Sequence, residues 1–246
     1  MIAAFKSNWQ KYLIEAWALG MFMLSATFFT GFIELPGLPV RQALTDPFVR
    51  RWLGGCAMGL TLVCLVYSGW GRRSGAHMNP AVTLTFLYLK KISRYDAFWY
   101  ILAQFAGGAA AMLWMKVLFP AFTAAPEVNY VQTQPGMAGA AAAFFAEIAI
   151  SSGLFLTILY SSNYEKTAPY TGLIAGFLVM CYITFESPVS GMSMNPARSI
   201  ASAVAAGNFS NQWIFFIAPL LGMMGAAKAW KWWICRKPEF KCSYQG

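Results

Sequence analysis

Two short stretches of the chain are nearly identical: residues 75–86 read GAHMNPAVTLTF and residues 191–202 read GMSMNPARSIAS. Asparagine is favoured at the N-cap of a helix, and proline at the first helical position, where its missing N–H removes no bond. We therefore expect short helices over about residues 79–89 and 195–206. Each begins at an Asn-Pro-Ala triplet: Asn79, Pro80 and Ala81 in the first, Asn195, Pro196 and Ala197 in the second.

The rest of the chain has the composition of a membrane protein. Of its 246 residues, 58% are apolar and only 11% are charged. A membrane-spanning helix needs about 20 mostly apolar residues. Six stretches approach or exceed that length: residues 12–33, 51–70, 97–119, 137–160, 168–185 and 212–234. Lys6 and Lys11 precede a run long enough to span, so we expect no cleaved leader.

The triplets and spans divide the chain into two repeats. Glu15 lies in the first span of one repeat (about 10–119), and Glu147 lies in the first span of the other (about 137–234). Because each repeat has three spans, the second repeat must be inverted in the membrane relative to the first. We expect a single transmembrane channel domain over 1–246, in which 235–246 form a basic cytoplasmic tail.

The helices that follow the triplets are too short to span. About three helical turns cannot cross roughly 30 Å of hydrocarbon. In inverted repeats they enter from opposite sides, so their N-termini should meet near the midplane. The backbone before each triplet is tolerated at that depth only if it lines a water-filled lumen. We expect a ladder of lumen carbonyls from Gly75, Ala76, His77, Met78, Gly191, Met192, Ser193 and Met194.

This arrangement predicts the chemistry of the lumen. Each helix N-terminus carries about half a positive charge, and the two asparagine amides add N–H donors. Such a centre suits neutral molecules that accept hydrogen bonds, such as water, and it repels cations and interrupts a proton wire. Arg198 follows the second triplet, and a cation at this depth is functional by default. We expect outer-loop carbonyls to hold it, so that it narrows the outer mouth.

Other ionisable groups allow two interpretations each. Glu15 and Glu147 could carry protons, but their matching positions favour structural acceptors that brace the two re-entrant loops. His77 could gate with pH, although packing or hydrogen bonding is the commoner role. Arg72 and Arg73 could form a cytoplasmic gate or contact lipid, or could be inner-face charges only.

Charge placement predicts the orientation. With both termini cytoplasmic, 13 of the 18 lysines and arginines lie on the inner side, as the positive-inside rule requires. The remaining five are Arg41, Arg50, Arg51, Lys116 and Arg198. We expect a multi-pass protein of the plasma (inner) membrane, in contact with the lipid bilayer.

These residues resemble the major intrinsic protein family, the aquaporins and aquaglyceroporins, and in particular a bacterial-type aquaporin. The resemblance runs from Glu15 to Gly225 and rests on the paired triplets, Arg198 and the two glutamates. It implies an all-α fold of six transmembrane helices plus two re-entrant half-helices, with one pore in each protomer of a homotetramer. The tetramer comes from the resemblance alone.

The resemblance also implies an outer selectivity constriction at Met58, Ile183, Met192 and Arg198. Relatives that conduct only water resemble one another in having Phe and His at the first two of these positions, and this chain has neither residue there. The expected constriction therefore has one polar wall and three apolar walls. This set of residues argues against strict specificity for water.

Other positions do not follow the glycerol-type pattern. Such relatives usually place Asp directly after the arginine and a Lys or Arg five residues after it, where this chain has Ser199 and Ala203. Phe215 and Phe216, just before Pro219, look more like the water type.

We therefore predict a passive channel for water and small uncharged solutes that excludes ions and protons. A glycerol or small-polyol facilitator is the alternative within the family. An ion- or proton-coupled transporter and an adhesion or scaffold protein with a vestigial pore are the rivals from other classes. No nucleophile with a base, nucleotide loop or Cys/His metal spacing appears, so we expect no enzyme activity, no cofactor, no metal and no nucleic-acid partner.

Overall fold

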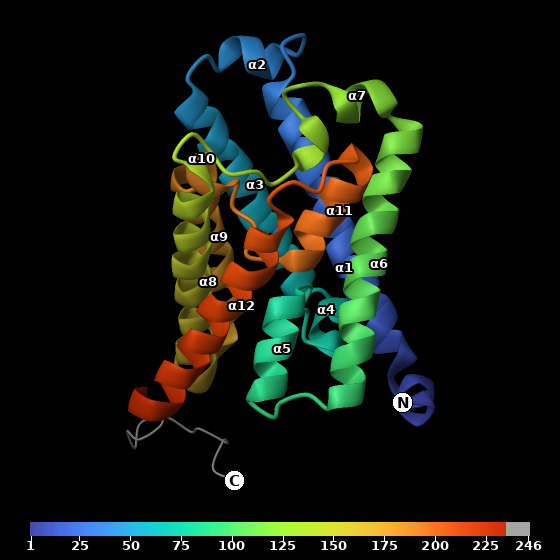
Figure 1. The fold of residues 1–246 in the computed structure, drawn as a ribbon, viewed down its shortest axis with the longest axis vertical. Coiled ribbons are helices and arrows are strands. Elements are labelled where there is room, and N and C mark those ends of the chain that lie inside the picture. Colours follow the sequence, from blue (N-terminus) through green and yellow to red (C-terminus); the bar gives the residue numbers. More distant parts are fainter. Residues whose placement is uncertain (235–246) are drawn as a thin grey trace.

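A computed structural model describes residues 1–234, and the basic tail predicted at 235–246 lies outside these residues. Throughout 1–234 the structure is helical and has no strand. Figure 1 shows the arrangement of the helices. Their bounds are α1 Ile2–Glu34, α2 Pro39–Ala43, α3 Pro47–Tyr67, α4 Gly69–Ser74, α5 Pro80–Tyr88, α6 Arg94–Leu118, α7 Pro120–Ala124, η1 Asn129–Val131, α8 Gly139–Asn163, η2 Ala168–Tyr170, α9 Thr171–Phe185, α10 Ser187–Ser190, α11 Pro196–Ala206, α12 Gln212–Ala229 and η3, a π-helical turn, Trp230–Ile234.

Six of the described helices are long and apolar enough to cross a membrane. They are α1, α3, α6, α8, the continuous segment Ala168–Phe185 that contains α9, and Gln212–Trp233, which contains α12. These are the six spans expected from the sequence. The first helix is longer than predicted because it already begins at Ile2, before the apolar run.

The two repeats pair their helices in the same way. Helix α1 packs along α6 in the first repeat, and α8 packs along α12 in the second, while α3 and α9 pack across the two repeats. Small residues allow these close approaches. A Cβ on Gly59 of α3 would lie 2.6 Å from the carbonyl oxygen of Gly176 in α9, a separation that two packed backbones cannot accommodate.

Two glycines with helical spacing do not lie at a helix contact within the described residues. The sequence spacing of Gly54 with Gly55 and Gly59, and of Gly225 with Gly222, predicts that all of them pack against neighbouring helices. A Cβ at Gly54 or Gly225 would nevertheless have no atom within 4 Å. Helical spacing shows that residues share a face and does not show which face meets a neighbour.

Helices α5 and α11 are the two half-helices. In Figure 1 they lie one above the other inside the bundle, α5 in the lower half and α11 in the upper half, with their starts near mid-height. Because the chain enters them from opposite ends, the repeat is inverted. The fold is therefore the predicted one: six spanning helices and two re-entrant half-helices in an inverted 3+3 repeat.

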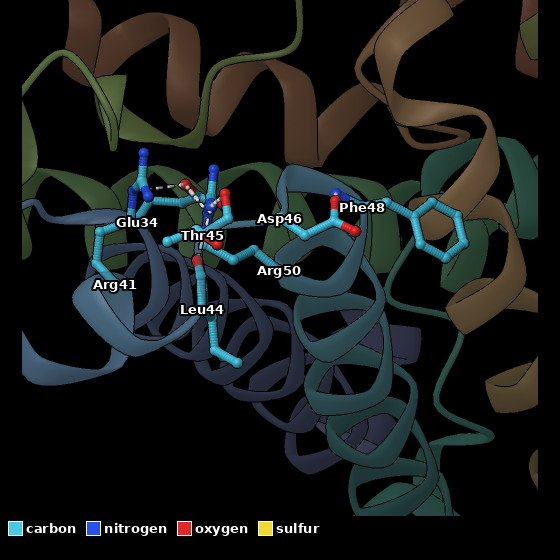
Figure 2. A network of polar contacts seen from close by, with 7 residues as sticks. All are labelled: Glu34, Arg41, Leu44, Thr45, Asp46, Phe48 and Arg50. Atoms are coloured by element: carbon cyan, nitrogen blue, oxygen red, sulfur yellow. Dashed lines mark hydrogen bonds and ion pairs between the residues drawn. The ribbon is translucent and has the colours of Figure 1, made fainter.

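The long first loop is held at the end of the bundle by one buried arginine. Arg50 donates from Nε to Glu34 Oε2 at 2.9 Å and from Nη1 to the carbonyls of Leu44 and Thr45, both at 2.8 Å. Asp46 caps α3 by accepting from the backbone N–H of Phe48. Figure 2 shows how this network ties the loop to the end of α1 and the start of α3.

Candidate functional site

The two triplets meet and are bonded to each other. The side-chain Oδ1 of Asn79 accepts from the backbone N–H of Ala81 at 2.9 Å, so Asn79 caps α5, and its Nδ2 donates to the carbonyl of Met194 at 2.6 Å. Asn195 caps α11 through Ala197 and Arg198, and its Nδ2 donates to the carbonyl of Met78 at 2.7 Å. Each asparagine therefore fixes its own helix start against the opposite loop.

An unusual backbone path leads into each triplet. Ser74 ends α4 and Ser190 ends α10, and each is followed by a glycine in the left-handed region, Gly75 (φ 89°) and Gly191 (φ 80°). Four residues other than glycine also have positive φ: Ala76 at 47°, Met78 at 50°, Met192 at 49° and Met194 at 53°. A positive φ is unfavourable for such residues, so other contacts must hold these loops.

Glu15 supplies those contacts for the first loop. This fully buried side chain accepts from Ser74 Oγ (2.8 Å) and the backbone N–H of His77 (3.0 Å) on Oε1. On Oε2 it accepts from the backbone N–H of Met78 and from Gln104 Nε2, both at 2.7 Å. All four partners are donors, which satisfies N–H groups that would otherwise be orphaned at membrane depth.

Glu147 makes the equivalent contacts in the second repeat. It is fully buried and accepts from Ser190 Oγ (2.8 Å), the backbone N–H of Ser193 (2.6 Å) and the backbone N–H of Met194 (2.7 Å). Neither glutamate is among the residues that line the main cavity. This geometry favours the bracing interpretation over the proton-carrier one.

A second pair of contacts connects each loop to its own half-helix. His77 Nδ1 lies 3.0 Å from Thr83 Oγ1, and Ser193 Oγ lies 2.5 Å from Ser199 Oγ. Both pairs are six residues apart, so they occupy equivalent places in the two repeats. The His77 ring also stacks on Phe86, with ring centroids 4.9 Å apart. This places His77 in hydrogen-bonded and aromatic packing at the cavity wall.

One cavity of about 950 Å³ runs through the bundle. Its wall includes all four predicted constriction residues (Met58, Ile183, Met192 and Arg198), both triplet asparagines and all eight loop residues at 75–78 and 191–194. Lining residues also come from both ends of the bundle, Gln132 at one and Pro169 at the other. Pro80, Ala81, Pro196 and Ala197 are buried behind this wall and position the asparagines.

The predicted ladder of lumen carbonyls differs at its two inner ends. The carbonyls of Met78 and Met194 are occupied by the asparagine amides of the opposite repeat. They therefore stabilise the crossing of the loops in addition to lying at the cavity wall. Because this contact joins residues 115 and 117 positions apart, no local sequence pattern could show it.

Arg198 also differs from the expectation. Its backbone N–H bonds to Asn195, but no outer-loop carbonyl within residues 1–234 accepts a hydrogen bond from its side chain, and Nη1 is buried without a partner. In the outer loop before α8, three consecutive residues (129–131) adopt left-handed dihedrals. The guanidinium stands in the cavity wall with donors that remain available.

An apolar wall, which was not predicted from the sequence, lines the cavity along α3 and α9. Helix α3 contributes Met58, Leu62 and Val66, and α9 contributes Ala175, Val179 and Ile183. Within each helix these residues are four positions apart, so they share one face. The signal was therefore present: extending four-residue steps inward from Met58 and Ile183 would have found these residues. The cavity has hydrogen-bonding groups on one side and hydrocarbon on the other.

Comparison with known proteins supports the same grouping. The sequence profile described as major intrinsic protein matches residues 4–230. Aquaporin NIP1-4 from Oryza sativa subsp. japonica is 32% identical over 214 residues, which is 86% of this chain and 74% of that protein. Aquaporin NIP2-2 from Zea mays is 34% identical over 173 residues, 70% of this chain and 56% of that one.

Coverage of the relatives is uneven. The chain spans 57% of the length of a relative from Arabidopsis thaliana at 35% identity. Among solved structures, the aquaglyceroporin from Plasmodium falciparum superposes with a TM-score of 0.76 at 19% identity, covering 92% of this chain and 97% of that one. That likeness concerns the fold.

Proposed function

The chain belongs to the major intrinsic protein family, and from this membership we propose that it is a passive channel for water and small uncharged solutes. The observation that carries the proposal is the meeting of two half-helix N-termini, cross-bonded through Asn79 and Asn195, in the wall of a cavity lined from both ends of the bundle. No cofactor or covalent step enters the proposed transport.

The electrostatics of the lumen support exclusion of cations. Two helix N-termini place partial positive charge at one level, and Arg198 adds a full positive charge to the wall. Each asparagine uses one Nδ2 hydrogen for the opposite loop, which leaves one for a passing molecule. A water molecule at this level accepts from both asparagines, so its own hydrogens point away and the proton wire is interrupted.

The apolar wall supports fast passage of neutral molecules. Leu62 and Val179 can accept no hydrogen bond, so a water in the lumen exchanges bonds only with the loop side and with neighbouring waters. An ion in the lumen would have to lose hydration water beside this wall, and the wall offers no ligand in its place. A coupled transporter would require ion ligands in the cavity, and the two buried carboxylates are instead occupied by the loops.

A mainly glycerol-conducting channel is the second candidate. It is favoured by the predicted constriction set, because Met58, Ile183 and Met192 line the same cavity as Arg198 and are all apolar. An amphipathic polyol could place its carbon chain against these residues and its hydroxyls against the guanidinium. The substrate test must therefore measure both water and glycerol.

Osmotic shrinkage of proteoliposomes, followed by light scattering, tests the proposal. We expect faster shrinkage than in empty vesicles, first with an impermeant osmolyte and then with glycerol to measure its entry. Val179→Trp should block the lumen, whereas Phe177→Trp on the exposed face of the same helix should not. No acceleration by the unmodified chain, or equal flux through both variants, would contradict the proposal.

The setting of this channel is also part of the proposal. We place both termini in the cytoplasm, because the loops that carry Lys90, Lys91 and Lys166 lie at the same end of the bundle as the N-terminus. We further propose the plasma (inner) membrane and a homotetramer with one pore in each chain. Protease accessibility of tagged termini and the mass of the detergent-solubilised protein test these points.

A further inference from the structure

A second, smaller cavity lies away from the channel, where α5 and α12 reach the same end of the bundle (Figure 1). It has a volume of about 390 Å³ and is lined by Tyr88, Lys228, Lys231 and Trp232. Tyr88 ends α5, Lys228 is in the last turn of α12, and the other two follow in the π-helical turn. None of these residues lines the channel.

Two lysines line this cavity, and no carboxylate from residues 1–234 lies among its lining residues. Lys231 Nζ lies 4.7 Å from the centroid of the Tyr88 ring, a cation–π contact that holds its ammonium group at the cavity. Within residues 1–234 the only ion pairs join Glu34 to Arg41 and Arg50, at the opposite end of the molecule. Lys228 and Lys231 place two positive charges at the cavity, and an anion bound there would reduce the repulsion between them.

The position of the cavity indicates which kind of anion can reach it. The candidate span Gln212–Trp233 ends here, and Trp232 and Trp233 are 58% and 66% exposed. Exposed tryptophans at the end of a span lie at the headgroup level of the bilayer. The lysine stems can lie along apolar surface while the ammonium groups reach the same level. The groups available there in high concentration are lipid phosphates.

We propose that this cavity binds the phosphate of an anionic phospholipid headgroup. Two ammonium groups attract the phosphate, and the aromatic rings of Tyr88 and Trp232 contact the headgroup or upper acyl chain. Anionic lipid binds better than zwitterionic lipid, because a choline ammonium next to the phosphate meets the same two lysines. The site does not depend on transport through the channel.

Native mass spectrometry of the full chain in detergent tests the proposal. We expect phosphatidylglycerol to bind at one tight site per chain, and phosphatidylcholine to bind at least tenfold more weakly. Each lysine near an anionic surface contributes about fivefold in affinity. Lys228→Gln or Lys231→Gln should therefore lower the affinity for phosphatidylglycerol about fivefold, and the double variant should lower it about thirtyfold. Lys→Arg at both positions should retain binding.

Matched controls separate the site from general surface charge. Lys6→Gln with Lys166→Gln removes two exposed lysines on the same side of the protein and should leave phosphatidylglycerol affinity unchanged. Osmotic water flux should be equal in all variants, which shows that each is folded. Equal losses in the site and control pairs, or no preference for phosphatidylglycerol, would overturn the proposal. Equally tight binding of soluble glycerol phosphate would also overturn it, by assigning the site to a free anion.

Discussion

The two loop-bracing glutamates should differ in how much each stabilises the protein. Glu15 receives two donors on each oxygen, whereas Glu147 receives two on Oε1 and one on Oε2. Glutamine keeps one acceptor oxygen and replaces the other with an NH₂ group. Whichever way the amide is turned, Glu15→Gln orphans two donors. Glu147→Gln can orphan only one, the backbone N–H of Met194.

The expected magnitude follows from this count. A buried donor left without a partner costs about 1–3 kcal/mol. Glu147→Gln should therefore lower the free energy of unfolding by about 1–3 kcal/mol and Glu15→Gln by about 2–6 kcal/mol. Both changes should also lower water permeability, because Met78 and Met194 carry the carbonyls that hold the opposite asparagines.

Thermal unfolding in detergent, followed by circular dichroism, measures the order of the variants. Glu165→Gln provides the control, since Glu165 is an exposed carboxylate in the loop between α8 and η2. We expect unfolding temperatures in the order control, Glu147→Gln, Glu15→Gln, from highest to lowest. Equal unfolding temperatures for Glu15→Gln and Glu147→Gln, or a lower one for Glu147→Gln, would refute the number of donors as the reason why these glutamates stabilise the protein.

Three further predictions concern selectivity, packing and pH. Ile183→His adds a polar group to the constriction and should lower glycerol flux more than water flux in proteoliposomes; equal losses would show that this position does not set selectivity. Gly59→Val should lower the unfolding temperature, because its Cβ would lie 2.6 Å from the Gly176 carbonyl; overpacking costs about 1–3 kcal/mol, and Gly225→Ala, with open space, should not lower it. Burial raises the pKa of Glu186, just beyond α9, from 4.5 to about 7. The folded state then holds this proton more tightly than the unfolded state, so stability should fall as pH rises from about 4.5 to about 7. Glu186→Gln should flatten that part of the stability profile; an unchanged slope would contradict the assignment.

Much of the fold could be predicted because it depends on local chemistry. The asparagine and proline of each triplet fix a helix start within one residue, and the apolar runs give the six spans within a few residues of their bounds, except at the start of α1. Inversion follows from an odd number of spans in each repeat. These features need only residue order and the thickness of a bilayer.

The remaining features depend on contacts between distant segments. The cross-bonds from Asn79 and Asn195 to the opposite loops appear only when the two repeats are assembled. A contact between Arg198 and an outer-loop carbonyl depends on the path of a loop that is distant in the sequence. The loop before α8 takes a left-handed path that its sequence, without glycine at residues 129–131, does not signal. Gly54 and Gly225 were assigned to helix contacts because spacing alone does not identify the partnered face.

Simultaneous measurement of water and proton flux in the same proteoliposomes tests the central claim most directly. An osmotic gradient and a pH gradient are applied together, and shrinkage and an enclosed pH dye are followed. The opposed helix starts predict rapid water flow with a proton leak no greater than that of empty vesicles. A proton flux that rises with the amount of protein, in proportion to water flow, would contradict the account.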